Sequence, residues 1–263
     1  SDLNSMRQTL LFGGLEAIAY NINHQRADLK LFEFGNCYFK TGAEDAEDAL
    51  RPYQEETHLS LFLSGDHTPA SWAEEKTTAD YFHMKGYVES LLDKLGFSIS
   101  KLKIEEIQND IFSQGLRYKL KKNTLAEIGM VSDKILKDFD IGQSVLFGDI
   151  QWDTVMKLAE NNRVEYQGIS KYPEVRRDLA LLLNEDVRFK DIEDLAYQTE
   201  RKTLKRVSLF DVYQGEKLGA NKKSYAVSFI LQDENQTLKD KQIDKIMDKL
   251  IKTFKEKLGA EIR

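Results

Sequence analysis

The residues best suited to metal binding or acid–base catalysis are few and scattered. The chain has four histidines, His24, His58, His67 and His83, and a single cysteine, Cys37. A zinc site usually takes its ligands from closely spaced histidine or cysteine pairs, but the sequence contains no HExxH or CxxC pattern. We therefore predict no metal site.

Nucleotide chemistry and nucleophilic catalysis also lack their usual motifs. There is no GxxxxGK[ST] loop, no strand–GxGxxG–helix unit and no GxSxG elbow. Gly13 and Gly14 lie inside a predicted helix rather than ahead of one, so they do not form a phosphate-binding loop. Acid pairs such as Glu55-Glu56 lie in polar loops, where carboxylates usually serve solubility. The sequence therefore predicts no catalytic residues.

Cys37 is the one candidate nucleophile by residue type. It lies within the strand-like run from Leu31 to Phe39, so we interpret it as a small, partly buried hydrophobic residue. A lone thiol makes no internal disulfide, which indicates a reducing cytoplasm.

The predicted helices and strands, which would position any functional site, fall into two parts along the chain. The first predicts helices packed on a largely antiparallel sheet, an α+β arrangement. Ser5 and Gln8 form an S-x-x-Q capping box, so a helix is expected to follow, with Gly13-Gly14 permitting a close approach. An acidic loop is expected over 41–56 and a turn at Lys122-Asn123. Further helices are expected at 79–95 (ended by Gly96), from Ser132 and at 152–159, and strands at 29–39, 57–63, 99–106, 112–121, 124–131 and 144–151.

The second part predicts the order β-α-β-β-α-β, which is the ferredoxin-like split motif. Its long helix, at about 239–257, has apolar residues at helical spacing, with Thr237 as the expected cap and Gly259 as the expected end. The other elements are strands at 178–183, 204–213, 223–231 and 258–263 and a helix at 189–200. The polar stretch 160–163 is the best boundary, which divides the chain into domains 1–160 and 161–263.

Length, ends and charge limit the class of protein. A chain of 263 residues suggests two domains, and its start without methionine suggests a piece of a longer protein. No apolar run is long enough to cross a bilayer, and no secretion signal precedes the first helix. Residues 1–163 carry 18 basic and 26 acidic residues, whereas 164–263 carry 20 and 18. The second domain can therefore bind RNA by stacking and a few arginines, but not by bulk charge.

The C-terminal domain resembles ferredoxin-fold anticodon-binding domains. Residues 170–180 (SKYPEVRRDLA) are similar to their S-x-[YF]-P-x-x-x-R-D-[LI] opening, and 209–213 (LFDVY) to their F-D-x-Y element. The segments 222–224 (KKS), 236–238 (QTL) and 259–263 (GAEIR) resemble three later elements of that family, in the same order.

The N-terminal domain resembles the synthetase-like domain of bacterial phenylalanyl-tRNA synthetase β subunits. Residues 6–11 (MRQTLL) and 31–35 (LFEFG) are similar to its M-R-x-[ST]-L-L and L-F-E-[IVF]-G motifs. Residues 80–86 (DYFHMKG) match its D-F-[FY]-D-[LM]-K-G element, with His83 in place of the aspartate.

These resemblances imply the C-terminal part of a β subunit, with a catalytically inactive class II synthetase-like sheet followed by an anticodon-binding domain. No F-R-x-E motif follows the strand at 31–39, so catalysis would belong to the α subunit of an α₂β₂ heterotetramer. The full enzyme would use ATP and Mg²⁺ in the cytoplasm to join phenylalanine to its tRNA. This segment is expected to have no cofactor of its own and to contact the α subunit and phenylalanine tRNA, but neither membrane nor DNA.

The same resemblance implies the residues that bind the anticodon. Tyr213 would stack on a base from the open face of the sheet, although packing on the core is the other interpretation. Arg177 would contact a phosphate or base edge, or else pair with Asp178 or Asp211. Asp211, Lys223 and Arg263 complete the predicted set.

Two questions stay open on the sequence alone. Phe210 is out of phase with Tyr213 on the same strand, so we predict that it lies in the core. A stand-alone regulatory or RNA-binding module is the alternative function, and co-purification with a catalytic α subunit would distinguish the two.

Overall fold

The computed structural model describes residues 5–40, 53–69, 71–160, 162, 170–215, 218–219 and 221–262. The chain divides into two compact units, Ser1–Glu165 (the first unit) and Tyr166–Arg263 (the second unit), each described by itself. Both combine helices with antiparallel sheets, so the expected α+β class is confirmed. Among the described residues, no helix is long and apolar enough to span a bilayer.

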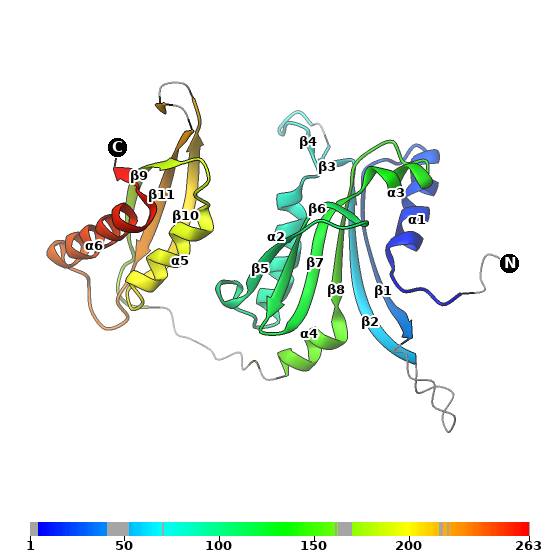
Figure 1. The fold of residues 1–263 in the computed structure, drawn as a ribbon, viewed down its shortest axis with the longest axis horizontal. Coiled ribbons are helices and arrows are strands. Elements are labelled where there is room, and N and C mark those ends of the chain that lie inside the picture. Colours follow the sequence, from blue (N-terminus) through cyan, green and yellow to red (C-terminus); the bar gives the residue numbers. More distant parts are fainter. Residues whose placement is uncertain are drawn as a thin grey trace. The chain divides into compact units, whose positions relative to one another are not determined.

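A six-stranded antiparallel sheet organises the first unit (Figure 1). Its order is β1-β2-β8-β7-β6-β5, so β1 and β5 are the edges. A two-stranded sheet of β3 (Asp66–Thr68) and β4 (Thr77–Thr78) lies apart from it, and a 3₁₀ turn covers Ile99–Lys101. The six strands are β1 (Leu29–Lys40), β2 (Tyr53–Ser64), β5 (Lys103–Ile107), β6 (Phe112–Leu120), β7 (Asn123–Val131) and β8 (Val145–Gln151).

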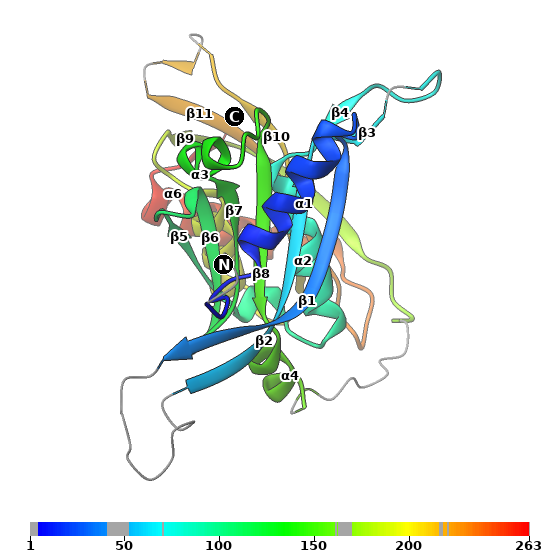
Figure 2. The ribbon, with the colours of Figure 1, turned by 90° about the vertical axis from the view of Figure 1, so that its right-hand side faces the viewer.

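Helices cover both faces of this sheet. Helix α1 (Leu11–Asn23) lies across one face with α3 (Asp133–Asp138), as Figure 2 shows, and their core includes Phe62 and Phe147. Helix α2 (Tyr81–Lys94) and helix α4 (Trp152–Ala159) pack on the other face, around residues such as Met84 and Tyr118. Because successive side chains of a strand point to opposite faces of the sheet, each strand contributes residues to both cores.

The first helix begins later than the sequence predicts. Its N-cap is Leu10, so the expected capping box at Ser5 and Gln8 is wrong. The hydroxyl of Thr9 instead accepts a hydrogen bond from the Leu11 N–H at 3.1 Å. The two glycines differ as well. A Cβ on Gly14 would lie 2.0 Å from Cζ of Phe62, whereas one on Gly13 would meet nothing within 4 Å. Only Gly14 marks the close helix–sheet approach that was expected.

Other boundaries shift by a few residues. Residues 53–56, expected in the acidic loop, belong to β2, while 41–52 lie outside the described residues. The turn expected at Lys122-Asn123 is formed by Lys121 and Lys122, with φ of 56° at Lys121. Gly96 has φ of 82° directly after α2, as predicted for a glycine that ends a helix. The stretch 160–163 is described only at residues 160 and 162.

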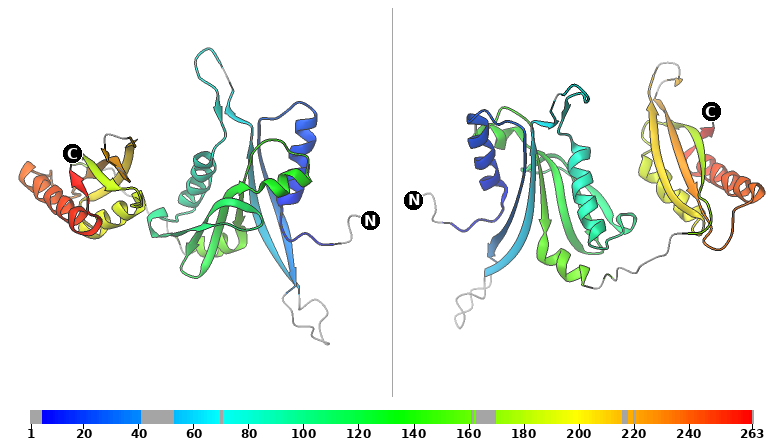
Figure 3. Two further views of the ribbon diagram at one scale, coloured as in Figure 1. Left: turned by 45° about the horizontal axis from the view of Figure 1, so that its top comes forward. Right: turned by 180° about the vertical axis from the view of Figure 1, so that it is seen from behind.

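The second unit has the predicted ferredoxin-like order, and its sheet order is β10-β11-β9-β12. Helices α5 and α6 lie on the same side of this sheet (Figure 3). They bury a core that includes Phe229 and Phe254. Its elements are β9 (Val175–Asn184), α5 (Phe189–Thr199), β10 (Leu204–Tyr213), β11 (Lys222–Leu231), α6 (Asp240–Leu258) and β12 (Glu261–Ile262).

The long helix α6 starts with a different cap from the one expected. Its N-cap is Lys239, whose backbone N–H donates to Oε1 of Gln242 at 2.9 Å, so the prediction of Thr237 is wrong. The end is as predicted, because Gly259 adopts the left-handed conformation at φ 63°.

Candidate nucleic-acid interface

One face of the second unit's sheet carries no described helix. Along β11, Tyr225, Val227 and Phe229 pack into the core with α5 and α6, so the alternate residues must face the other side. The pairing of β11 with β9 and β10 then shows which side chains of those two strands point to the same side. We call this side the open face: Arg176, Asp178, Ala180 and Leu182 from β9, Arg206, Ser208, Phe210, Asp211 and Tyr213 from β10, and Ser224, Ala226, Ser228 and Ile230 from β11.

A β-bulge decides which way Phe210 points. Leu209 pairs with Val227 and Asp211 pairs with Ala226, so Phe210 is the extra residue in the strand. Its side chain is 52% exposed, and its ring lies on the open face, 5.1 Å from the guanidinium carbon of Arg176. The prediction that Phe210 lies in the core is therefore wrong. In a regular strand, residues 210 and 213 would point to opposite faces of the sheet. The extra residue of the bulge turns both side chains to the same face.

Tyr213 is the last residue of β10 and lies on the open face opposite Ser224. It is 43% exposed, so its ring is not sealed under a helix. A Cβ on Gly215 would lie only 2.8 Å from the phenolic oxygen, which means that the backbone passes close beside the ring. Asp211 is also exposed on this face, two residues before Tyr213 and next to the bulge. The phenol and carboxylate therefore point to the same side of the sheet.

The adjacent arginines point to opposite sides of β9. Arg177 pairs with Phe229, a core residue, so it faces the helices, and its guanidinium lies 3.9 Å from the Asp240 carboxylate. The alternative of an Arg177 pair with Asp178 or Asp211 is not what the structure shows. It is Arg176 that donates from Nε to Asp178, at 2.8 Å. The open-face arginine is thus Arg176, which sequence reasoning missed.

A signal for this assignment was present in the sequence. Leu179, Leu181 and Leu183 share one side of β9, which places odd-numbered residues inward and Arg176 outward. Ala180 and Leu182 are also apolar, so the strand shows no clean alternation of apolar and polar residues, and the signal was weak.

The two remaining predicted residues do not join the open face. Lys223 is only 7% exposed and faces the helix side, where Nζ donates to the Glu185 carbonyl at 2.7 Å and lies over the Tyr225 ring. Arg263 lies outside the described residues. The structure therefore brings Tyr213 and Asp211 together and separates them from Arg177 and Lys223.

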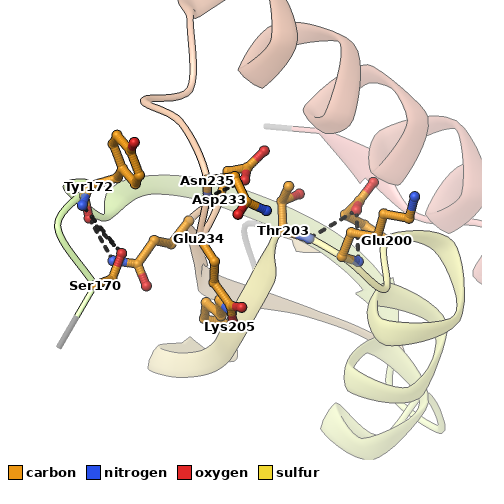
Figure 4. Close-up of polar contacts among 10 residues, drawn as sticks. Ser170, Tyr172, Glu200, Thr203, Lys205, Asp233, Glu234 and Asn235 are labelled. Atoms are coloured by element: carbon orange, nitrogen blue, oxygen red, sulfur yellow. Dashed lines mark hydrogen bonds and ion pairs between the residues drawn. The ribbon is translucent and has the colours of Figure 1, made fainter. Parts of the chain in front are cut away.

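Polar contacts hold the start of β9, as Figure 4 shows in part. The Tyr172 N–H donates to the Ser170 hydroxyl at 3.3 Å, and Gln232 Nε2 donates to the Tyr172 carbonyl at 2.7 Å. Nearby, Lys205 forms an ion pair with Glu234 at 2.6 Å. The Gln232 contact ties the opening motif at 170–180 to the end of β11, and so it helps to position the strand that carries Arg176.

In the first unit, polar side chains meet around His58, which is 5% exposed. Its Nδ1 lies 2.9 Å from Asp149 Oδ1, and its Nε2 lies 3.5 Å from the Glu56 carboxylate. Burial lowers the pKa of His58, but the hydrogen bond and charge of Asp149, together with Glu56, outweigh it and raise the pKa overall. This cluster links β2 to β8 by a hydrogen bond that becomes an ion pair when His58 is protonated.

Cys37 is fully buried near this cluster. Burial, with the charge of Asp149, raises the pKa of its thiol to about 11. Since the thiolate is the nucleophilic form, Cys37 is a packing residue, as the sequence indicated. Among the described residues, no group of three or more histidine, cysteine, aspartate or glutamate side chains could hold a metal ion.

We expect the first unit to lose part of its stability as pH rises through the folded-state pKa of His58. A raised pKa means that the folded protein binds the proton more tightly, so the contribution is complete only below the unfolded value of about 6.5. Unfolding of wild type and His58→Gln should be followed across neutral and alkaline pH. The advantage of wild type should shrink with rising pH, and a difference that is independent of pH would contradict the assignment. Asp149→Asn is the matched test of the partner.

Two family models match the chain. The model of the ferredoxin-fold anticodon binding domain matches residues 170–263. The model described as the phenylalanyl tRNA synthetase beta chain CLM domain matches residues 1–152, more than half of the chain.

Curated relatives match along the whole chain. Phenylalanine–tRNA ligase beta subunits of Bacteroides fragilis, Bacteroides thetaiotaomicron and Porphyromonas gingivalis are 50%, 49% and 40% identical to it. Each match covers 100% of this chain but 32% of the relative, so the chain spans about a third of their length. A solved pyrrolysyl-tRNA synthetase from Desulfitobacterium hafniense aligns over 59% of this chain and 50% of its own, with 15% identity and a TM-score of 0.44, too low for a conclusion.

Proposed function

Since the chain belongs to the family of phenylalanyl-tRNA synthetase β chains, we propose that it is a non-catalytic part of a phenylalanine–tRNA ligase that binds the anticodon region of phenylalanine tRNA. The full enzyme would use ATP and Mg²⁺ for aminoacylation in the cytoplasm. This chain would carry neither of them and would contribute the RNA-binding sheet and a scaffold.

The observation that carries the RNA-binding proposal is the exposed phenol of Tyr213 on a face without a described helix. Exposed aromatic rings on an open sheet suit single-stranded RNA because every base has a π-face to stack on. Asp211 can accept hydrogen bonds from a base edge, and Ser224 opposite Tyr213 can donate or accept. We assign anticodon contacts to Tyr213 and Asp211, and structural roles to Arg177 and Lys223.

We propose that the first unit packs on a catalytic α subunit within an α₂β₂ assembly. Its surface supports this role, because large aromatic side chains are exposed along the edge strand β1. Phe32 is 71% exposed, and Phe34 is 51% exposed with its ring against Trp152. Exposed apolar side chains grouped in this way are typical of protein interfaces.

Replacing Tyr213 with alanine should weaken the tRNA-dependent step of the full enzyme by about 5- to 150-fold, which is the worth of one base–aromatic stack. Phenylalanine-dependent ATP–pyrophosphate exchange should stay intact, because that step needs no tRNA. Both steps should be measured on the assembled enzyme that contains this chain.

Tyr213→Phe is the matched control, since it keeps the ring and loses only the hydroxyl. It should retain most of the tRNA-dependent activity. If Tyr213→Ala left aminoacylation unchanged, or abolished exchange as well, an anticodon role for the open face would be excluded.

A further inference from the structure

The open face carries a second aromatic position beside Tyr213. Phe210 and Tyr213 both lie on the open face, because Phe210 is the extra residue of the bulge, its ring is next to Arg176, and Tyr213 pairs with Ser224. In the register of β11, Tyr213 pairs with Ser224, whereas Phe210 has no partner and lies between the Leu209–Val227 and Asp211–Ala226 pairs. At a rise of about 3.4 Å per residue, a separation of two to three residues along β11 places the two side chains roughly 7–10 Å apart.

Packing in the core does not explain why position 210 is a phenylalanine. Its ring is 52% exposed, and the core side of the strand at this level is filled by Leu209. The exposed part of the ring is not used in packing. It does present a flat apolar surface to a ligand.

Arg176 and Asp178 hold the ring in place. The guanidinium carbon of Arg176 lies 5.1 Å from the ring centroid of Phe210, and its Nε donates to Asp178 at 2.8 Å. Such a cation–π contact, fixed by a carboxylate, restricts the ring before any ligand arrives. Nε is one of five N–H donors on the guanidinium, and the others can bind an RNA phosphate.

We propose that Phe210, positioned by Arg176, forms a second base-stacking site on the open face, next to the base that stacks on Tyr213. This inference rests on the proposed RNA-binding function and deepens it. The ligand is single-stranded RNA of at least two adjacent nucleotides, whose bases occupy the two aromatic positions. Ala180, Ala226 and Ser224 place small side chains on the open face beside the two aromatic positions. The charges of Arg176 and Asp178 nearly cancel each other, so base stacking rather than bulk charge provides the affinity for RNA.

The test measures binding of the 263-residue chain to the anticodon stem-loop of phenylalanine tRNA. Phe210→Ala should weaken binding by about 5- to 150-fold, while Phe210→Trp should keep it. Val212→Ala is the matched control, because Val212 is 50% exposed on the same strand but pairs with Tyr225 on the helix side. It should leave binding unchanged.

Removing single bases from the anticodon loop of the RNA should identify the base that stacks on each aromatic ring. The loss caused by Phe210→Ala should disappear when one particular anticodon base is removed, and the loss caused by Tyr213→Ala should disappear at the neighbouring base. Arg176→Gln should reduce binding in the same base-dependent way as Phe210→Ala, which a purely structural role would not do.

The outcomes separate this inference from the function that it rests on. If Tyr213→Ala weakens binding and Phe210→Ala does not, the second site is refuted and the anticodon role stands. If neither matters, both fail. A Phe210→Ala loss that persists with every abasic loop would also overturn the stacking site, because it would reflect a change in the sheet itself.

Discussion

Replacing Phe254 with alanine should strongly destabilise the second unit and leave the stability of the first unit unchanged. Phe254 has no exposed surface, and its ring lies 5.9 Å from that of Phe229 under α6. Removing a buried phenylalanine ring costs about 3–5 kcal/mol, against a typical domain stability of about 5–15 kcal/mol. The unit that carries the open face would then be marginal at physiological temperature, so the proposed RNA binding should fall with it.

The two tryptophans, Trp72 and Trp152, are both in the first unit, which makes the measurement selective. Tryptophan fluorescence should report an unchanged transition, while hydrogen exchange in 175–262 should accelerate. Lys252→Ala is the control, since Lys252 is an exposed residue of α6 that lies 3.9 Å from the Glu256 carboxylate. A change of both transitions in Phe254→Ala would show that the two units do not unfold separately.

Replacing Phe62 with alanine should destabilise the first unit by about 3–5 kcal/mol. Phe62 is 1% exposed, and its ring lies 5.1 Å from that of Phe147. It also occupies the space over Gly14, where a Cβ would lie 2.0 Å from Cζ. Gly14→Ala alone should therefore destabilise by about 1–3 kcal/mol through overpacking, despite the better helix propensity of alanine.

The two substitutions should not add. In the Phe62→Ala background the clash is gone, so Gly14→Ala should become neutral or stabilising, with a coupling energy of about 1–3 kcal/mol. Gly13→Ala is the control, because a Cβ at that position would meet nothing within 4 Å, and it should stabilise α1 by up to about 1 kcal/mol. Denaturant unfolding of the four members of the cycle measures this, and simple additivity would rule out the proposed contact.

Much of the fold follows from local patterns. The spacing of apolar residues along α6 predicts a helix with one buried face, and Gly259 ends it because glycine tolerates φ of 63°. The order of elements in the second unit was also predictable, since each segment has its own period. Helix starts were less certain. Thr237, Ser5 and Gln8 have suitable side chains for capping, but the chain leaves those positions outside the helices.

The candidate site was predictable only in part. Tyr213 lies on the open face, as expected, while its contact with RNA remains a proposal. The sequence separates Arg176 from Arg177 only weakly, because Ala180 and Leu182 on the outer side of β9 are apolar like the leucines on its inner side. Lys223 is in a basic segment, but its backbone partner at Glu185 holds it on the helix side.

The sequence by itself determined the order of helices and strands, the two-part organisation and the presence of aromatic residues near the end of β10. These depend on neighbouring residues, whose propensity and periodicity act over a few positions. Only the tertiary structure decided which side chains share a face. The bulge at Phe210 arises from the pairing of β10 with β11, and one inserted residue reverses the direction of every side chain beyond it.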